Sequence, residues 1–209
     1  MSLVLWLPLS LALAGQTITE HTFEQEPVGV SPAGFSFSSM RQPEPGRWTV
    51  QKRDEAGVLC HDRDESTGYS LAVADDRAPA DLIVTARLRL TEGARTGGLV
   101  WRYLDDRHYY ALALNLARGE IVLYRIHAGH RITLARQDDL EIDPDAWHTL
   151  KVLHAGGTIR ALLGGVRVFD YEDGRDRWPD RPSRVGLIAT GDSGVEFDDL
   201  RIAPRSDRR

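Results

Sequence analysis

Short apolar or alternating segments, separated by turn-forming residues, run through almost the whole chain. Most of them show a period of two, which is typical of strands with one buried face. Clusters such as Asp105-Asp106 and Gly164-Gly165 bound them. The segments are residues 47–51, 69–74, 81–90, 97–104, 109–116, 121–127, 131–136, 148–154, 158–163, 166–171, 184–189 and 195–202.

Strands at a spacing of roughly 8–12 residues predict an all-β fold, a two-sheet antiparallel β-sandwich. About a dozen strands divide naturally into two sheets of roughly six or seven strands, which is a jelly roll. The 209 residues suffice for one domain of this kind. We expect a single domain over residues 15–204 and a flexible tail over residues 205–209.

The N-terminus predicts a secretory signal peptide over residues 1–14. Leu3 to Ala14 is apolar apart from Ser10 and ends in Ala12-Leu13-Ala14, the small-x-small form of a cleavage site. The run is shorter than the about 20 apolar residues of a membrane span. A buried first strand or a membrane anchor is the alternative, since no Lys or Arg precedes the run. We expect export to the periplasm or extracellular space, without stable membrane insertion after cleavage.

Charge and cysteine content argue against nucleic-acid binding and exclude an intrachain disulfide. The net charge is −5 and the Lys and Arg residues are spread along the chain, so there is no basic stripe for nucleic acid. Cys60 is the only cysteine, which rules out an intrachain disulfide. We expect Cys60 to be a small buried hydrophobe. The alternative is a catalytic thiol, but His61 points to the opposite face of a strand.

The stretch Leu140 to Trp147, LEIDPDAW, imitates the Glu-x-Asp-x-x-Glu strand of polysaccharide-cleaving β-sandwiches. That chemistry needs two carboxylates on one face of a regular strand. Here Ala146 stands at the position of the second glutamate, and Pro144 would remove a ladder hydrogen bond. The sequence therefore predicts a turn that leads into a strand beginning near Trp147.

An ordered set of local patterns resembles the concanavalin A-like lectin/glucanase superfamily, and within it the exported bacterial domains described as 3-keto-disaccharide hydrolase-like. Laminin G-like modules are more distant relatives. The resemblance implies a two-sheet jelly roll with a concave face that often meets carbohydrate. The patterns are Phe23-Glu24, residues 32–35, Trp48-x-Val50, Val58-Leu59, residues 97–105, Tyr109-Tyr110, residues 147–152, residues 159–165, residues 185–187 and residues 197–200.

The hairpin over residues 97–116 carries the first candidate ligand site. The alternation places the apolar stripe Tyr110, Leu112, Leu114 and Leu116 toward the core and the opposite stripe, with small alanines, toward solvent. Sugars need polar partners for their hydroxyls and rings for their apolar faces. The alternative is an Arg–Asp pair that only joins the hairpin, with the tyrosines packed. The candidate ligand residues are Arg102, Asp105, Tyr109 and Asn115.

Two further arginines, Arg87 and Arg89, share one face of the strand over residues 81–90. On a concave sheet they would favour hydroxylated or acidic glycans, whereas on an exposed sheet they would be solvated charges. His61 is a further candidate ligand residue. A loop around Trp178, with Asp173, Asp176 and Asp180, would lie at the edge of the cleft.

Metal and cofactor signals are sparse. The histidines show no zinc-type spacing. A structural calcium is the one candidate cofactor, because oxygen ligands near the first and last strands would hold it. Glu24, Asp198 and Asp199 fit that arrangement, and acidic turns that bond backbone amides are the alternative. The sequence contains neither a Gly-x-Ser-x-Gly elbow nor a phosphate-binding loop before a helix.

These observations favour an exported carbohydrate-binding jelly roll that recognises an oligo- or polysaccharide on its concave face. The first alternative is a glycoside hydrolase or lyase of the 3-keto-disaccharide type, for which His61, Asp105, Tyr109 and Arg102 would be candidates. The second is a laminin G-like structural or interaction module. A groove with exposed rings, a pocket of converging polar groups and a flat apolar patch would distinguish the three.

Overall fold

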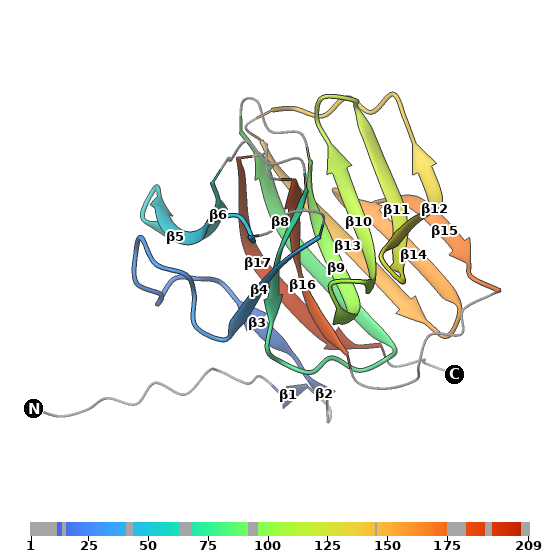
Figure 1. The fold of residues 1–209 in the computed structure, drawn as a ribbon, viewed down its shortest axis with the longest axis horizontal. Coiled ribbons are helices and arrows are strands. Elements are labelled where there is room, and N and C mark those ends of the chain that lie inside the picture. The colour runs from blue at the N-terminus through green and yellow to red at the C-terminus, as the bar shows by residue number, and fades with distance from the viewer. Residues whose placement is uncertain are drawn as a thin grey trace, which may run out of the picture.

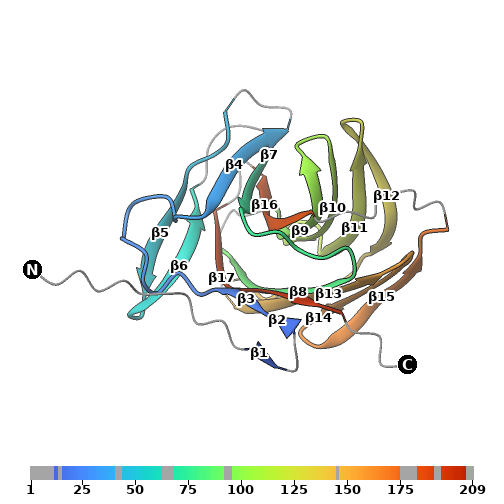
Figure 2. The same ribbon diagram turned by 90° about the horizontal axis from the view of Figure 1, so that it is seen from below.

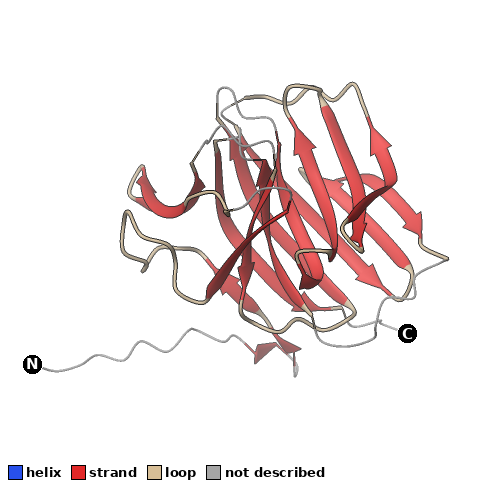
Figure 3. Cartoon of the chain, viewed as in Figure 1, coloured by secondary structure: helices blue, strands red, loops and turns tan. Residues whose placement is uncertain are grey.

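The computed structural model describes residues 12–13, 16–40, 44–62, 68–91, 96–144, 146–174, 183–190 and 194–205. Within these ranges the chain consists of strands and their connections, without helix (Figure 3). The all-β prediction is therefore confirmed. No helix in the described ranges is long and apolar enough to cross a membrane. Most of the predicted signal peptide, and residues 206–209 of the predicted tail, lie outside the described residues.

The strands differ in length from two to ten residues. They are β1 (Ala12–Leu13), β2 (Gln16–Thr17), β3 (Thr19–His21), β4 (Phe35–Met40), β5 (Trp48–Arg53), β6 (Ala56–His61), β7 (Tyr69–Ala74), β8 (Leu82–Leu90), β9 (Thr96–Asp105), β10 (His108–Asn115), β11 (Glu120–His127), β12 (His130–Gln137), β13 (Trp147–Ala155), β14 (Thr158–Leu163), β15 (Val166–Glu172), β16 (Arg184–Thr190) and β17 (Val195–Pro204).

Two antiparallel sheets stack to form the sandwich (Figures 1 and 2). One has seven strands in the order β12-β11-β10-β9-β16-β7-β4, and the other has eight, in the order β15-β14-β13-β8-β17-β6-β5 with β3 paired to β17. In Figure 2 the ends of the seven-stranded sheet, β4 and β12, rise above its middle, so its outer face is concave. The two-sheet prediction is confirmed, with one more strand in the second sheet than expected.

The main core lies between the sheets and follows the predicted alternation. Tyr110, Leu112 and Leu114 of β10 point inward and are fully buried. From the facing sheet, Leu88 of β8 and Val152 of β13 belong to the same cluster. Each such side chain contributes roughly 1.5–3 kcal/mol through removal of its apolar surface from water.

The concave face also buries apolar side chains, in a second cluster. Tyr109, Ala111 and Ala113 of β10 point to this side, together with Val122 of β11 and Ile188 of β16. Antiparallel sheets commonly expose one face to solvent. Here the middle of the seven-stranded sheet is apolar on both faces, and polar groups occur only around this apolar area.

Close contact between strands at the centre of this sheet depends on glycine. A Cβ atom at Gly98 of β9 would stand 2.1 Å from the carbonyl oxygen of Leu112, and one at Gly186 of β16 would stand 2.4 Å from that of Ala72. Both contacts are with backbone, which cannot move without breaking the pairing of β9 with β10 and of β16 with β7. The sheet centre therefore tolerates no side chain at these positions.

We expect Gly98→Ala to lower the free energy of unfolding by about 3 kcal/mol, because the added methyl group must displace paired backbone. Chemical denaturation followed by tryptophan fluorescence measures the change. Gly174→Ala is the matched control, since a Cβ there meets nothing within 4 Å. Equal stability of the two variants would contradict the assigned role of Gly98.

A groove on the concave face

A groove of about 620 Å³ opens on the concave face, toward the end where the β10–β11 turn lies. Its floor is formed by Ala113 of β10 and Val122 of β11, which are paired neighbours. Small and medium side chains here leave the space that rings fill further along the same face. The remaining lining residues are Tyr69, Thr96, Asn115, Ala117, Arg118, Glu120, Tyr124, Arg131, Thr133, Arg136 and Thr190.

A buried carboxylate stands on one wall of the groove. Glu120, the first residue of β11, is only 4% exposed. Its Oε2 lies 2.7 Å from Nη2 of Arg136, and its Oε1 lies 3.8 Å from Nη1 of Arg118. Arg136 also donates through Nε to Oδ1 of Asp138, at 2.6 Å. The two guanidinium groups balance the charges of the Glu120 and Asp138 carboxylates beside the groove.

Amide and hydroxyl groups continue this wall. Asn115 of β10 is the pairing partner of both Glu120 and Thr96, which places the three side chains in one row across the sheet. Its Nδ2 donates to Oγ1 of Thr96 at 3.1 Å, and its Oδ1 accepts from the backbone amide of Arg118 at 3.1 Å. Both ends of the amide are thereby oriented before any ligand arrives.

Aromatic side chains and one further arginine form the other end of the groove. The guanidinium carbon of Arg131 lies 4.1 Å above the ring of Tyr124, a cation–π contact. Nη1 of Arg131 donates to the hydroxyl of Tyr69 at 2.9 Å. The rings of Tyr69 and Tyr124 are 6.3 Å apart. The half-buried ring of Tyr69 is thus fixed at the edge of the groove.

The hydroxyl of Tyr124 is buried and has no hydrogen-bond partner among the described residues. Burial raises the pKa of this phenol well above its usual value. It therefore stays protonated and neutral at physiological pH.

Asn115 is the one predicted ligand residue of the hairpin that lies at the groove. Tyr109 points to the concave face as its alternation requires, but it is not open to a ligand, in agreement with the alternative in which the tyrosines are packed. Its side chain is fully buried, its ring stacks on that of Tyr103 at 6.0 Å, and its hydroxyl faces the Met40 sulfur at 4.0 Å. Burial raises the pKa of the Tyr109 phenol far above its usual value.

Arg102 does not share a face with these residues. It adopts a left-handed backbone conformation, φ 49°, where the β9–β10 register shifts. The bulge places Tyr103 on the concave face and directs Arg102 toward the carbonyl oxygens of Ala80, at 3.4 Å, and Gly156, at 3.2 Å. A bulge re-aims a side chain in this way. The expectation that Arg102 joins Tyr109 in one site is therefore wrong.

Asp105 lies at the β9–β10 turn, away from the groove. Its Oδ1 accepts from the backbone amide of Arg107 and contacts Nδ1 of His108, both at 2.8 Å. These bonds lower the pKa of the Asp105 carboxyl against the opposing effect of its partial burial. Asp105 thus joins the hairpin, although its partners are Arg107 and His108 and not Arg102.

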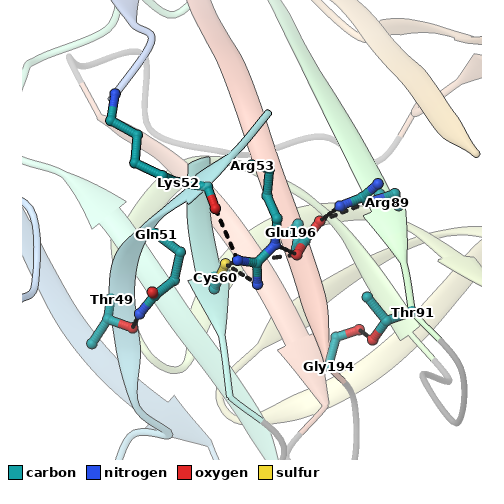
Figure 4. Close-up of polar contacts among 9 residues, drawn as sticks. All are labelled: Thr49, Gln51, Lys52, Arg53, Cys60, Arg89, Thr91, Gly194 and Glu196. Atoms are coloured by element: carbon teal, nitrogen blue, oxygen red, sulfur yellow. Dashed lines mark hydrogen bonds and ion pairs between the residues drawn. The ribbon is translucent and has the colours of Figure 1, made fainter. Parts of the chain in front are cut away.

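Arg87 and Arg89 lie on the outer face of the eight-stranded sheet, so the expectation that they line the concave face is wrong. Both guanidinium groups stack over the ring of Trp147, at 4.8 and 5.3 Å. Arg89 and Arg53 form ion pairs with the buried carboxylate of Glu196 from two sides (Figure 4). The arginines thus connect strands β5, β8 and β17 across one sheet.

His61 and Cys60 point to opposite faces of β6, as alternation requires. The His61 ring is 1% exposed and packs on the Trp48 ring at 4.8 Å, inside the sandwich. This burial separates it from the groove. The Cys60 sulfur lies 3.9 Å from Arg53 and 4.0 Å from Glu196 (Figure 4). Burial is the main cause that raises the pKa of the thiol to about 12.

The carboxylates proposed for calcium have protein partners. Oε2 of Glu24 accepts from the backbone amide of Gly57 at 3.0 Å and from Lys52 at 3.4 Å. Asp198 accepts from the amide of Asp199 at 2.7 Å, and Arg87 reaches Asp199 at 3.3 Å. The described residues contain no group of three His, Cys, Asp or Glu side chains arranged to bind an ion. The backbone-amide alternative fits Glu24 and Asp198.

Two other predictions concern loops. The stretch over residues 140–144 is a turn region with Glu141 and Asp143 exposed, and β13 begins at Trp147, so the turn prediction is confirmed. Trp178, Asp176 and Asp180 lie outside the described residues. Asp173 is buried and accepts from the Tyr110 hydroxyl at 3.1 Å.

Sequence reasoning missed most of the groove, including Glu120, Arg131 and Arg136. The available signal was the hairpin register: if Asn115 points outward, its partner across the turn points outward as well, which identifies Glu120. The β12 residues had no comparable signal, because a register shift after Leu123 offsets their pairing with β11.

A two-sheet jelly roll with a polar groove on its concave face defines a domain of the concanavalin A-like class. Residues 46–203 match the family described as the 3-keto-alpha-glucoside-1,2-lyase-like domain. The match spans well over half of the chain, and the chain belongs to this family. No curated protein sequence matches it significantly.

Solved structures share the fold at low sequence identity. The carbohydrate-binding module CBM66 from Bacillus subtilis is 16% identical, with a TM-score of 0.64 over 83% of this chain and 96% of that one. A Bacillus subtilis protein of unknown function with a galectin-like fold is 14% identical, with a TM-score of 0.60 over 81% and 90%. A putative glycosyl hydrolase from Parabacteroides distasonis is 12% identical, with a TM-score of 0.55 over 83% and 94%.

We predict that Cys60 is chemically inert in the folded protein. Since the pKa of its thiol is raised from 9.0 to about 12, the thiolate fraction at pH 8 falls about 1000-fold. Labelling with a chromogenic disulfide reagent should be slower by a factor of that order than labelling of the same protein in guanidinium chloride. Rapid labelling of the native protein would contradict the assigned burial.

Proposed function

We propose that this chain is an exported carbohydrate-binding domain that holds a glycan in the groove of its concave face. The observation that supports the proposal is that polar side chains line one side of the groove and an aromatic ring lines the other, with small apolar residues between them. Glu120, Arg136 and Asn115 form a preoriented polar wall, and the Tyr69 ring stands at the opposite edge. Sugars require both kinds of surface, one for their hydroxyls and one for their apolar faces.

The polar wall suits a pair of neighbouring sugar hydroxyls. A hydroxyl can donate to the Glu120 carboxylate while its neighbour accepts from Arg136 or from the Asn115 amide. The Glu120 carboxylate is already buried beside Arg136, and the Asn115 amide is oriented by Thr96 and by the backbone amide of Arg118. Part of the entropy cost of ordering these side chains is therefore incurred when the protein folds and not when the ligand binds.

The comparisons support this proposal at the level of fold. The chain shares its architecture with a module whose name states carbohydrate binding and with a protein described as a putative glycosyl hydrolase. Export, to the periplasm or outside the cell, rests on the apolar run in residues 1–14. An exported protein meets glycans of the cell envelope or surroundings, which agrees with the groove.

A second candidate function is a lyase acting on 3-keto-glycosides, favoured by the family description and by one observation. Among the residues that the structure describes, Glu120 is the single carboxylate lining the groove. Two-carboxylate hydrolysis needs a pair, whereas elimination needs one base. The Glu120 carboxylate would take the proton from C2 beside the ketone, and the electron pair would form the C1–C2 double bond as the C1–O bond breaks. The leaving oxygen would take a proton from water and depart as an alcohol. Arg136 would stabilise the enolate charge.

The laminin G-like alternative has less support. It predicts a flat apolar interaction surface. The exposed large hydrophobic residues of the described chain are Val28 and Val30 in the β3–β4 connection, Ile132 on β12 and Val166 on β15.

We expect Glu120→Gln to weaken glycan binding at least about tenfold, because a neutral amide accepts hydrogen bonds from sugar hydroxyls less strongly than a carboxylate. A glycan array first identifies a bound oligosaccharide, and isothermal titration calorimetry then gives the affinities. Tyr69→Ala should produce a loss of similar order through the missing ring contact.

Glu172→Gln is the matched control, because this exposed glutamate lies on β15 of the other sheet and bonds only Thr158 among the described residues. It should bind as the parent does. If Glu120→Gln folds normally and keeps full affinity, the groove is not the glycan site. If the array shows no binding and no glycoside is cleaved, the proposed function is wrong.

The two candidate functions differ in turnover. Incubation with 3-keto-glucosides, followed by nuclear magnetic resonance, detects an unsaturated elimination product. For a binding domain we expect none. A product that forms with the parent protein and disappears with Glu120→Gln would establish the lyase instead.

A further inference from the structure

The charges of the groove are distributed unevenly along β11 and β12. At one end, Arg118 and Arg136 are matched by the carboxylates of Glu120 and Asp138. At the other end stands Arg131, which has no carboxylate partner among the described residues; its contacts there are with the Tyr69 hydroxyl and the Tyr124 ring. Within the described part of the chain, the groove therefore has one guanidinium charge without a carboxylate beside it.

Arg131 is held in a defined position. Its guanidinium plane rests on the ring face of Tyr124, and one of its donors is bonded to Tyr69. Guanidinium carries five N–H donors in a rigid fork, which matches an anion with two oxygens. Most of these donors remain available to a ligand. The Tyr69 hydroxyl accepts from Arg131, so its own proton is available to the same anion.

The position of Arg131 also implies a minimum size of ligand. Arg131 and Arg136 are both on the groove side of β12, opposite Ile126 and Val122 of β11. Five residues of strand separate their backbones by on the order of 15 Å. A ligand that reaches from the Glu120 wall to Arg131 is therefore longer than one sugar ring.

We propose that the groove recognises an anionic oligosaccharide, with a neutral ring against Glu120 and Asn115 and an acidic group of a neighbouring ring paired with Arg131 and Tyr69. This inference rests on the proposed carbohydrate-binding function. A carboxylate of a uronic acid and a sulfate ester both supply the required oxygens. With a chain net charge of −5, the affinity for an acidic glycan must come from this local pairing and not from the overall field.

The test compares matched probes that differ only in charge. Calorimetry would measure binding of tetragalacturonate and its methyl ester, and of a sulfated galactose tetrasaccharide and its unsulfated form. We expect a charged probe to bind at least about tenfold more tightly than its neutral counterpart. The pair that shows the difference identifies carboxylate or sulfate as the anion.

Variants of Arg131 then test whether the tighter binding of the charged probe depends on this residue. Arg131→Gln should abolish the preference, so that the charged and neutral probes bind this variant with equal affinity. Arg131→Lys should restore part of the preference, because the charge returns without the fork. Arg167→Gln is the control, since this exposed arginine pairs with Asp170 on β15 of the other sheet. Circular dichroism melting confirms that each variant folds.

The outcomes separate this inference from the proposed function. Equal binding of charged and neutral probes, or a charge preference that survives in Arg131→Gln, would overturn the anionic ligand and leave the glycan groove in place. Failure of every glycan to bind would overturn both.

Discussion

Close approach of paired strands at the centre of the seven-stranded sheet is the constraint on which the functional face depends. Gly98 and Gly186 bring β9 and β16 against their neighbours at distances that no Cβ permits. Beside them on the concave face, Ala111 and Ala113 carry only short side chains. Larger side chains on the flanking strands surround these small residues. The groove is a consequence of missing side-chain atoms in the middle of a sheet, framed by strands that carry polar and aromatic groups.

The apolar character of the concave face explains why the polar groups gather at one end. Tyr103, Tyr109 and Met40 fill one part of the face and exclude water from it. Glu120 and its arginines stand where this filling ends. A carboxylate beside an apolar surface is poorly solvated, so it requires the two guanidinium groups that flank it. The same arrangement that stabilises Glu120 also leaves it oriented toward the groove.

Much of the fold follows from local sequence pattern, but the composition of the site does not. Alternation on β10 correctly separates Tyr110, Leu112 and Leu114 from Tyr109 and Ala113, because the period of a strand is a local property. It says nothing about what covers each face, so Tyr109 was expected to be open. The bulge at Arg102 shifts the alternation in a way that no residue type signals. The face occupied by Arg87 and Arg89 depends on the pairing of β8 with β13 and β17, which are distant in sequence.

Two of the arginines that border the groove, Arg131 and Arg136, belong to β12. This strand lies at the edge of its sheet and pairs only with β11 among the described strands. Most of its side chains are exposed, and few contribute to either apolar cluster. Substitutions on such a strand cost little folding energy, whereas substitutions in the glycine-rich centre cost much. If the groove holds a glycan as proposed, substitutions on β12 would change the selected ligand without rebuilding the core. Selectivity and foldability would then depend on different strands of the same sheet.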